Sequence, residues 1–230
     1  MAPMTWRIHA AMTALAYLAG AVPFAYLVAR MRGVDIRTVG SGNVGATNVF
    51  RAVGKGWGIL TFVLDAAKGL IPALVFPALA ARWTGQPAHP ALGLAYGAAA
   101  IAGHNWPVFL GFKGGKGVAT SAAVLLGAAP AAVGIGLALW IVVFVAGRYV
   151  SVASIAAAAA VAGAGWWLYA GEGPWRPAAL SVLGVLAIVR HRSNLRRLAA
   201  GTEHRFSFGR RGSPPPRGAG APPGDGGTGA

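Results

Sequence analysis

The feature that most constrains this chain is a set of long apolar segments with hardly a charge in them. Segments 8–29, 57–81 and 151–170 each run for about 20 mostly apolar residues, the length that a helix needs to cross the hydrocarbon core of a bilayer. Segment 91–108 meets this test less cleanly, and 177–189 is shorter but can be lengthened by its flanks. Because backbone inside a bilayer must satisfy its own hydrogen bonds, we expect these segments to be helices.

Composition supports an all-α polytopic membrane protein. The chain is 56% hydrophobic and only 11% charged, whereas a soluble domain carries roughly 25% charged residues. The first apolar segment ends at Ala29-Arg30-Met31-Arg32 without a small-residue cleavage site, so we expect a retained helix and not a signal peptide. The absence of cysteine excludes disulfides, thiolate catalysis and metal sites built on cysteine.

The region 118–147 is harder to assign, because a break near Gly127-Ala128-Ala129-Pro130 allows either one long tilted helix or two short ones. The distribution of charge favours two. The polar segments that can be grouped on one side are 30–56, 109–117, 147–150 and 190–217. Together they hold 16 of the 20 lysines and arginines, which predicts that this side is cytoplasmic and that the N-terminus is outside. Splitting the region then gives about seven spans, with a re-entrant pair as the alternative.

The C-terminal segment 209–230 consists mainly of Gly, Pro, Ala and Arg and has no large apolar residue. Such a segment cannot bury enough surface to order itself, so we expect a disordered cytoplasmic tail after an integral membrane domain at 1–208. Its arginines either touch anionic lipid or remain solvated. The formal net charge of +15 fits nucleic acid, anionic lipid or an anionic substrate, and its place on one side of a membrane protein argues against nucleic acid.

The first polar cluster is GSGNVGATNVFR at 40–51. Its start satisfies the dinucleotide pattern G-x-G-x-x-G, but that pattern requires a preceding strand, whereas a membrane span precedes it here. What remains is glycine-rich backbone with the hydroxyl of Ser41, the amides of Asn43 and Asn48, and the guanidinium of Arg51. The cluster therefore predicts either a ligand site or a polar loop that caps the next helix with Arg51 at the headgroups.

The second polar cluster is GHNWPVFLGFKGGKGVAT at 103–120. A Walker A loop needs Ser or Thr after its lysine, and Lys116 is followed by Gly117, so ATP hydrolysis is not expected. Glycine backbone at 114–117 still permits N–H groups to converge on an anion, and a helix that starts near Val118 would point its positive end at the same place. The alternative is a flexible loop with two lysines.

The third polar cluster is RHRSNLRRLAAGTE at 190–203. In a helix His191, Asn194 and Leu198 would share a face, while the arginines would spread over the others as in a basic interfacial helix. Glu203 is one of only five acidic residues in the chain, so we expect a structural ion pair. Within 57–81, Asp65 and Lys68 stand at i and i+3, and a mutual pair near the inner leaflet is expected because charges are costly in a membrane.

Taken together, the three clusters closely resemble the signature motifs of the bacterial membrane glycerol-3-phosphate acyltransferases that use acyl phosphate, the PlsY family. Their order and spacing agree over about residues 8–208, and the use of Leu195 where isoleucine is more usual is a slight departure. The resemblance implies transfer of a fatty acyl group from acyl phosphate to the 1-hydroxyl of sn-glycerol 3-phosphate, without acyl-CoA. The products would be lysophosphatidic acid and phosphate, the first step of phospholipid synthesis in the bacterial inner membrane.

The resemblance also implies roles for individual residues. Positions that match catalytic and substrate-binding residues of the family are Ser41, Arg51, Lys116, His191 and Asn194. Further substrate-binding positions are Gly42, Asn43, Asn48, His104, Gly114, Gly115, Gly117 and Thr120, while Glu203, Asp65 and Lys68 would be structural. Because acyl phosphate is already activated, no covalent intermediate on Ser41 is required, although a Ser41–His191 nucleophile pair is conceivable. His191 either binds phosphate or acts as general base, and in this family a substrate phosphate has also been proposed as the base.

Neither a metal nor a cofactor is expected. The partners implied are acyl phosphate, glycerol 3-phosphate and membrane lipids, and the docking of a soluble acyl-phosphate-producing enzyme on the basic face is left open. A transporter of phosphorylated solutes would need polar groups along a path through the midplane, where only Asp65 and Lys68 qualify. A lipid-binding scaffold would explain the cations but not Ser41 or His191 within the glycine-rich motifs.

Overall fold

The structure is a computed structural model, and it describes residues 2–206. Within that range every regular element is a helix, which confirms the all-α prediction. The elements are α1 (Ala2–Ala21), α2 (Phe24–Arg30), α3 (Ala46–Ala52), α4 (Lys55–Thr84), α5 (Ala91–Asn105), η1 (Val108–Leu110), α6 (Val118–Ala128), α7 (Pro130–Gly147), α8 (Val150–Tyr169), η2 (Ala170–Glu172), α9 (Trp175–Arg190) and α10 (Arg192–Ala199). The predicted tail at 209–230 lies outside the described residues.

Several helical stretches are long and apolar enough to cross a membrane, namely Thr5–Arg30, Lys55–Thr84, Pro130–Gly147 and Val150–Glu172. Their outward side chains are apolar, as at Val142, which is 64% exposed, and Trp167, which is 79% exposed. Helices contact one another through small residues: a side chain at Gly20 would collide with the backbone of Ala100 where α1 crosses α5. Apolar exteriors and small residues between helices are typical of bundles embedded in lipid.

The first apolar segment, predicted as one helix over 8–29, is broken. α1 ends at Ala21 and α2 begins at Phe24, because Pro23 has no N–H to continue the helix and disfavours helical backbone at Val22. At the break, the carbonyl of Val22 accepts hydrogen bonds from the N–H of Phe24 at 3.1 Å and from the ammonium of Lys68 at 2.8 Å. The break therefore ties α1 to the middle of α4.

The segment predicted as helical over 91–108 is shorter than expected. α5 ends at Asn105, and Trp106 leaves the helical region with φ −134° and ψ 65° because Pro107 follows it. The chain then forms the short helix η1 and turns back through Gly111 and Phe112, both of which have positive φ. Residues 106–117 therefore form a connection between α5 and α6 instead of the end of a helix.

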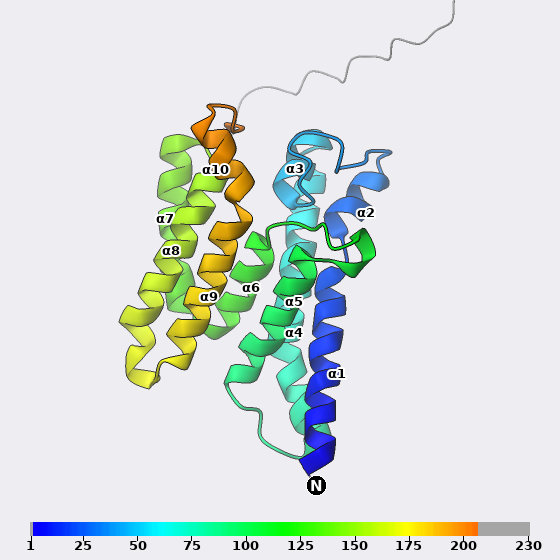
Figure 1. Ribbon diagram of the computed structural model, residues 1–230, viewed down its shortest axis with the longest axis vertical. Coiled ribbons are helices and arrows are strands. Elements are labelled where there is room, and N and C mark those ends of the chain that lie inside the picture. Colours follow the sequence, from blue (N-terminus) through cyan, green and yellow to red (C-terminus); the bar gives the residue numbers. More distant parts are fainter. Residues whose placement is uncertain (1, 207–230) are drawn as a thin grey trace, which may run out of the picture.

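Residues 118–147 form two helices, α6 and α7, that meet at Ala129, with Pro130 as the first residue of α7. In Figure 1 α6 runs downward and α7 runs upward. At about 1.5 Å per residue, the 11 residues of α6 cover only about half of the hydrocarbon thickness. Consistent with this, the segment before α6 lies lower in the figure than α3 and α10.

The connections separate into two ends. Figure 1 shows the N-terminus and the α4–α5 and α8–α9 connections at the lower end, and α2, α3 and α10 at the upper end. The α7–α8 turn also lies at the α10 end, because the N–H of Phe206 donates to the carbonyl of Arg148 at 2.7 Å. As far as residue 206, the segments that the charge distribution groups together and the three polar clusters therefore lie toward the upper end.

Candidate active site

The first polar cluster is organised around the side chain of Asn48, which is only 1% exposed. Its amide nitrogen donates to the carbonyls of Ile36, Val39 and Asn43, each at 3.1 Å, and its oxygen accepts from the N–H of Ser41 at 3.1 Å. Asn48 therefore folds the loop from inside and sets the position of Ser41. A role for Asn48 as a direct substrate ligand would compete with these four bonds.

Two glycines allow this loop to close. Gly40 and Gly42 have φ values of 59° and 65°, in the left-handed region that a residue with a Cβ rarely adopts. Ser41 stands half-buried between them, and its hydroxyl lies 3.5 Å from the N–H of Asn43. Arg51, in the last turn of α3, is exposed and has no ion-pair partner among residues 2–206. Both groups are thus available to a ligand.

The second polar cluster packs against the end of α5 with no space for side chains. A Cβ at Gly114 would collide with the carbonyl of His104, and one at Gly115 with the imidazole of His104 and the carbonyl of Val44. The contact with Val44 brings the second glycine segment against the first. Gly117, with φ 74°, leads directly into α6. The backbone N–H groups of Lys116 and Gly117 have no acceptor in the described part of the chain.

A chain of hydrogen bonds connects the second cluster to the third. The ammonium of Lys116 donates to the side-chain oxygen of Asn194, and the amide nitrogen of Asn194 donates to Oε1 of Glu203 at 2.6 Å. Oε1 also accepts from the hydroxyl of Ser151 at 2.7 Å, and Oε2 accepts from Nε of Arg197 at 2.8 Å. These bonds lower the pKa of the Glu203 carboxyl against the opposing effect of its burial. Glu203 is therefore an anionic anchor for Asn194 and Arg197.

Positive charge accumulates around Lys116. Burial lowers the pKa of Lys116 to about 8, the nearby guanidiniums of Arg197, Arg51 and Arg190 lower that pKa as well, and only Glu203 opposes them. Lys116 thus feels the charge of three arginines and of one carboxylate. A group of this kind favours an anion with more than one negative charge, such as a phosphate.

His191 joins the end of α9 to α10 and is 2% exposed. Burial, Lys116 and Arg190 lower the pKa of His191 to about 4, although a hydrogen bond to Ala187 and the charge of Glu203 act in the other direction. The imidazole is therefore neutral at neutral pH. Because a carbonyl can only accept, Nδ1 must donate the 2.8 Å bond to Ala187, which leaves the lone pair on Nε2.

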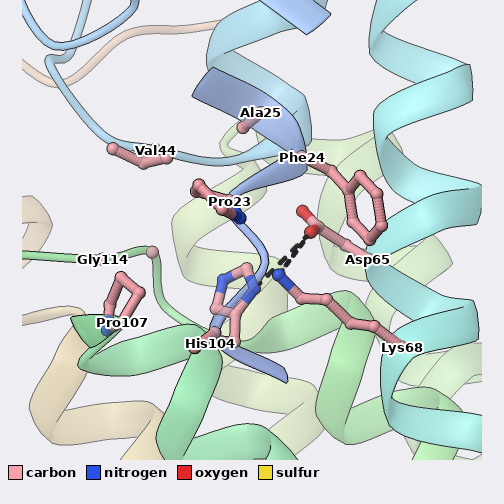
Figure 2. A pocket seen from close by; sticks show the side chains of 11 residues that line it. Pro23, Phe24, Ala25, Val44, Asp65, Lys68, His104, Pro107 and Gly114 are labelled. Carbon is pink, nitrogen blue, oxygen red and sulfur yellow. Dashed lines mark ion pairs between the residues drawn. The ribbon is translucent and has the colours of Figure 1, made fainter. Parts of the chain in front are cut away.

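Below the glycine segments lies a buried charged cluster, shown in Figure 2. The ammonium of Lys68 is 2.9 Å from Oδ1 of Asp65, and Nδ1 of His104 is 3.6 Å from the same oxygen. Thr120, which is fully buried, donates from its hydroxyl to the backbone carbonyl of Asp65 at 2.9 Å. His104 and Thr120 therefore face this cluster, and their assignment as direct substrate ligands stays a prediction.

The cluster and the glycine segments share a cavity of about 10 Å³. Its lining includes Pro23, Val44, Asp65, Lys68, His104 and Gly114, which are labelled in Figure 2, and also Gly115. A space of this size accommodates about one water molecule and not a phosphate. This cavity is therefore too small to be the substrate site.

Two residues contribute to the site in ways that the polar clusters did not indicate. The hydroxyl of Ser151 donates a hydrogen bond to the carboxylate of Glu203, and Arg190 donates to backbone carbonyls of the second glycine segment. Arg190 begins the third polar cluster, where it was expected only as one of the arginines of a basic interfacial helix. Ser151 lies outside the polar clusters, and its partner Glu203 is 52 positions away in the chain, so no local pattern indicated the contact.

The fold and the site together define an integral membrane protein with a cationic, glycine-lined anion site at one end of its helix bundle. A family model described as glycerol-3-phosphate acyltransferase matches residues 10–201. The glycerol-3-phosphate acyltransferase of Geobacter sulfurreducens is 47% identical over 200 residues, covering 85% of this chain and 96% of the relative. That of Desulforudis audaxviator is 46% identical over 196 residues, covering 84% and 93%.

Solved structures agree. The crystal structure of PlsY (YgiH), an integral membrane glycerol 3-phosphate acyltransferase, in its glycerol 3-phosphate form matches with a TM-score of 0.75 at 42% identity, covering 86% of this chain and 96% of that one. Its lysophosphatidic acid form matches with a TM-score of 0.73 at 40% identity, covering 86% and 95%. The chain belongs to the glycerol-3-phosphate acyltransferase family, of the PlsY type. It is a membrane enzyme of phospholipid synthesis that acylates glycerol 3-phosphate to lysophosphatidic acid.

Proposed function

We propose that this acyltransferase takes its acyl group from acyl phosphate and places it on the 1-hydroxyl of sn-glycerol 3-phosphate, releasing inorganic phosphate. The observation that carries the proposal is the concentration of positive charge around Lys116, which feels the charge of Arg197, Arg51 and Arg190 against that of one carboxylate, Glu203. Two substrates that each bring a phosphate group need such an excess. The solved PlsY structures in their glycerol 3-phosphate and lysophosphatidic acid forms support glycerol 3-phosphate as one of these two substrates.

Each residue of the site has a role that follows from its chemical group. Arg51 and Lys116 supply charge to phosphate oxygens, and Ser41 supplies a hydroxyl donor. The N–H groups of Lys116 and Gly117, which have no acceptor among the described residues, complete an anion nest. Asn194 holds the ammonium of Lys116 through its side-chain oxygen. None of these groups needs to become covalently attached to the acyl chain, because acyl phosphate is a mixed anhydride.

In the acyl transfer, the hydroxyl oxygen of glycerol 3-phosphate attacks the acyl carbonyl carbon, and the bond from that carbon to the phosphate oxygen breaks. The lone pair on Nε2 of His191 accepts a hydrogen bond from the hydroxyl and orients it. With its pKa lowered to about 4, His191 is a weak final acceptor for the proton. The proton therefore passes to a substrate phosphate, which is the stronger base of the two near neutral pH.

An assay with two alternative donors tests the proposal. Purified protein in detergent is given labelled glycerol 3-phosphate with either acyl phosphate or acyl-CoA, and lysophosphatidic acid is measured. We expect product with acyl phosphate only. The Lys116→Met variant should lose this activity, whereas Lys113→Met, which removes an exposed lysine from the same segment, should keep it. Product from acyl-CoA alone would contradict the donor assignment.

We also propose that the active-site end faces the cytoplasm, with the N-terminus outside and α6 and α7 each counted as a crossing, so that the chain spans the membrane seven times. The positive-inside rule supports this orientation. The chain has no cysteine, so single cysteines can report on it without background. In intact spheroplasts, an impermeant maleimide should label Gln86→Cys and Ala131→Cys but not Ser193→Cys, all of which are exposed positions. The reverse pattern would contradict the orientation.

A further inference from the structure

The last residue of α9, Arg190, uses one terminal nitrogen to hold the second glycine segment. Nη2 donates to the carbonyl of Gly115 at 2.6 Å, to that of Asn105 at 3.1 Å and to that of Gly114 at 3.3 Å. The guanidinium carbon also lies 5.4 Å from the centre of the Trp106 ring. All of these contacts belong to residues 105–115, so Arg190 joins α9 to the connection between α5 and α6.

These contacts decide which way the peptides of the segment face. In a trans peptide the C=O and the following N–H point in opposite directions. The N–H of Gly115 accordingly points away from Arg190 and donates to the carbonyl of His104 at 3.2 Å. By the same geometry, the carbonyl of Gly115 faces Arg190 and the N–H of Lys116 faces away from it. That N–H is one of the donors without an acceptor in the described chain.

The charge of Arg190 is not neutralised by the protein. Among the described residues it pairs with no carboxylate, and its Nε is buried without a hydrogen-bond partner. A half-buried guanidinium with a buried, unpaired Nε and no carboxylate partner costs free energy, which is consistent with a role for the arrangement that it enforces. Here the enforced arrangement is the direction of the peptide between Gly115 and Lys116.

We propose that Arg190 is a positioning residue for acyl transfer: it holds the carbonyls of Gly114 and Gly115 toward itself so that the N–H of Lys116 faces the substrate phosphate. Because His191 follows directly and Asn194 lies one turn further, the same contacts fix the glycine segment against α10. Arg190 does not itself touch the substrate. The inference deepens the proposed function and rests on its phosphate nest.

The test compares three variants. Arg190→Met removes the donors but keeps an unbranched side chain. Arg190→Lys keeps three protons on one terminal nitrogen, which can still reach carbonyls. Arg192→Met removes an equal charge from an exposed position on the next turn and serves as the matched control. Initial rates are measured against glycerol 3-phosphate and against acyl phosphate, and thermal unfolding in detergent is recorded for each variant.

We expect Arg190→Met to raise the KM for at least one phosphate substrate by about tenfold or more, since small misplacements of binding groups have effects of this size. Arg190→Lys should restore most of that loss, and Arg192→Met should change KM by less than about twofold. Added guanidinium ion should partly restore an Arg190→Ala variant, an effect that a general loss of stability would not show.

The inference is overturned if Arg190→Met keeps its KM values, or if it loses activity only in proportion to a lower unfolding temperature with no response to guanidinium. It is also overturned if Arg192→Met has the same effect, because bulk charge would then be the cause. The donor assay on the unaltered protein is independent of these results. Normal KM values in Arg190→Met together with acyl-phosphate activity in the parent protein would therefore remove this inference and leave the proposed function in place.

Discussion

The ammonium of Lys116 donates a hydrogen bond to the side-chain oxygen of Asn194, although 78 positions separate the two residues in the chain. This contact joins the glycine segment before α6 to the short helix α10. Glu203 and Arg197 continue it on the α10 side. The charge that binds phosphate is therefore held by a network that depends on a distant part of the sequence, and its parts can be tested separately.

Removal of the Asn194 amide should impair binding more than folding. We expect Asn194→Leu to lower kcat/KM for glycerol 3-phosphate by about 100-fold, because Lys116 would lose its anchor and one buried partner of Glu203 would be missing. Asn194→Asp should be less harmful to Lys116 but should repel phosphate. Steady-state rates for both variants check the prediction, with Ser193→Ala as an exposed neighbouring control. A normal KM in Asn194→Leu would contradict it.

Activity should decline at alkaline pH. The pKa of Lys116 is lowered to about 8 by burial and by neighbouring arginines, so its charge is present below that pH and is lost as pH rises through it. We expect kcat/KM to fall with pH above about 8, and the fall to move to higher pH in Lys116→Arg because a guanidinium stays charged. A pH–rate profile that is flat up to pH 10 would show that deprotonation of Lys116 does not limit the rate.

His191 should orient the hydroxyl and not act as the final base. We expect His191→Gln to raise KM while kcat stays within about tenfold, since general-base catalysis contributes about 100-fold or more. The low pKa of about 4 also predicts that no histidine ionisation limits the rate between pH 5 and 8. A rise in rate near pH 6.5 that disappears in His191→Gln would instead assign the base to this residue.

Glu203 should influence both stability and the titration of Lys116. Glu203→Gln keeps the shape but removes the negative charge that supports Lys116, so the alkaline decline in rate should begin at a lower pH than in the parent protein. The unfolding temperature should also fall, because Arg197 loses its buried partner. Glu172→Gln breaks the more exposed pair with Arg176 and should change little. If Glu203→Gln left the pH profile unchanged, the charge of Glu203 would not influence the titration of Lys116.

The buried pair of Asp65 and Lys68 should be structural. We expect Asp65→Asn to destabilise the protein by about 3–5 kcal/mol, because it leaves a buried ammonium without a carboxylate. The double variant Asp65→Asn with Lys68→Met should recover part of that loss, since no unpaired charge then remains. Thermal unfolding in detergent measures both. If the double variant were as unstable as the sum of the single variants, the two residues would not act as a pair.

Part of the site was readable from the sequence. The long apolar segments and the charge distribution predicted a helical bundle with the polar clusters at one end, whereas the anion nest that the glycine-rich motifs predict around Lys116 stays a prediction. The role of a single polar residue depends on where its side chain points, which the sequence does not show. Asn48 and Thr120 have the chemistry of ligands, but their side chains turn inward and hold the loop and α6 in place.

The sequence by itself determined the membrane setting and the family, because both are recorded in local patterns: runs of apolar residues long enough to cross a bilayer, and motifs with fixed spacing. Only the tertiary structure decided that the carbonyl of Val22 accepts a hydrogen bond from Lys68, that Ser151 donates one to Glu203 and that Arg190 donates to the carbonyls of Gly114 and Gly115. These contacts join residues between 46 and 76 positions apart. A hydrogen bond of this kind depends on where helix packing brings the two groups, and no local pattern records that position.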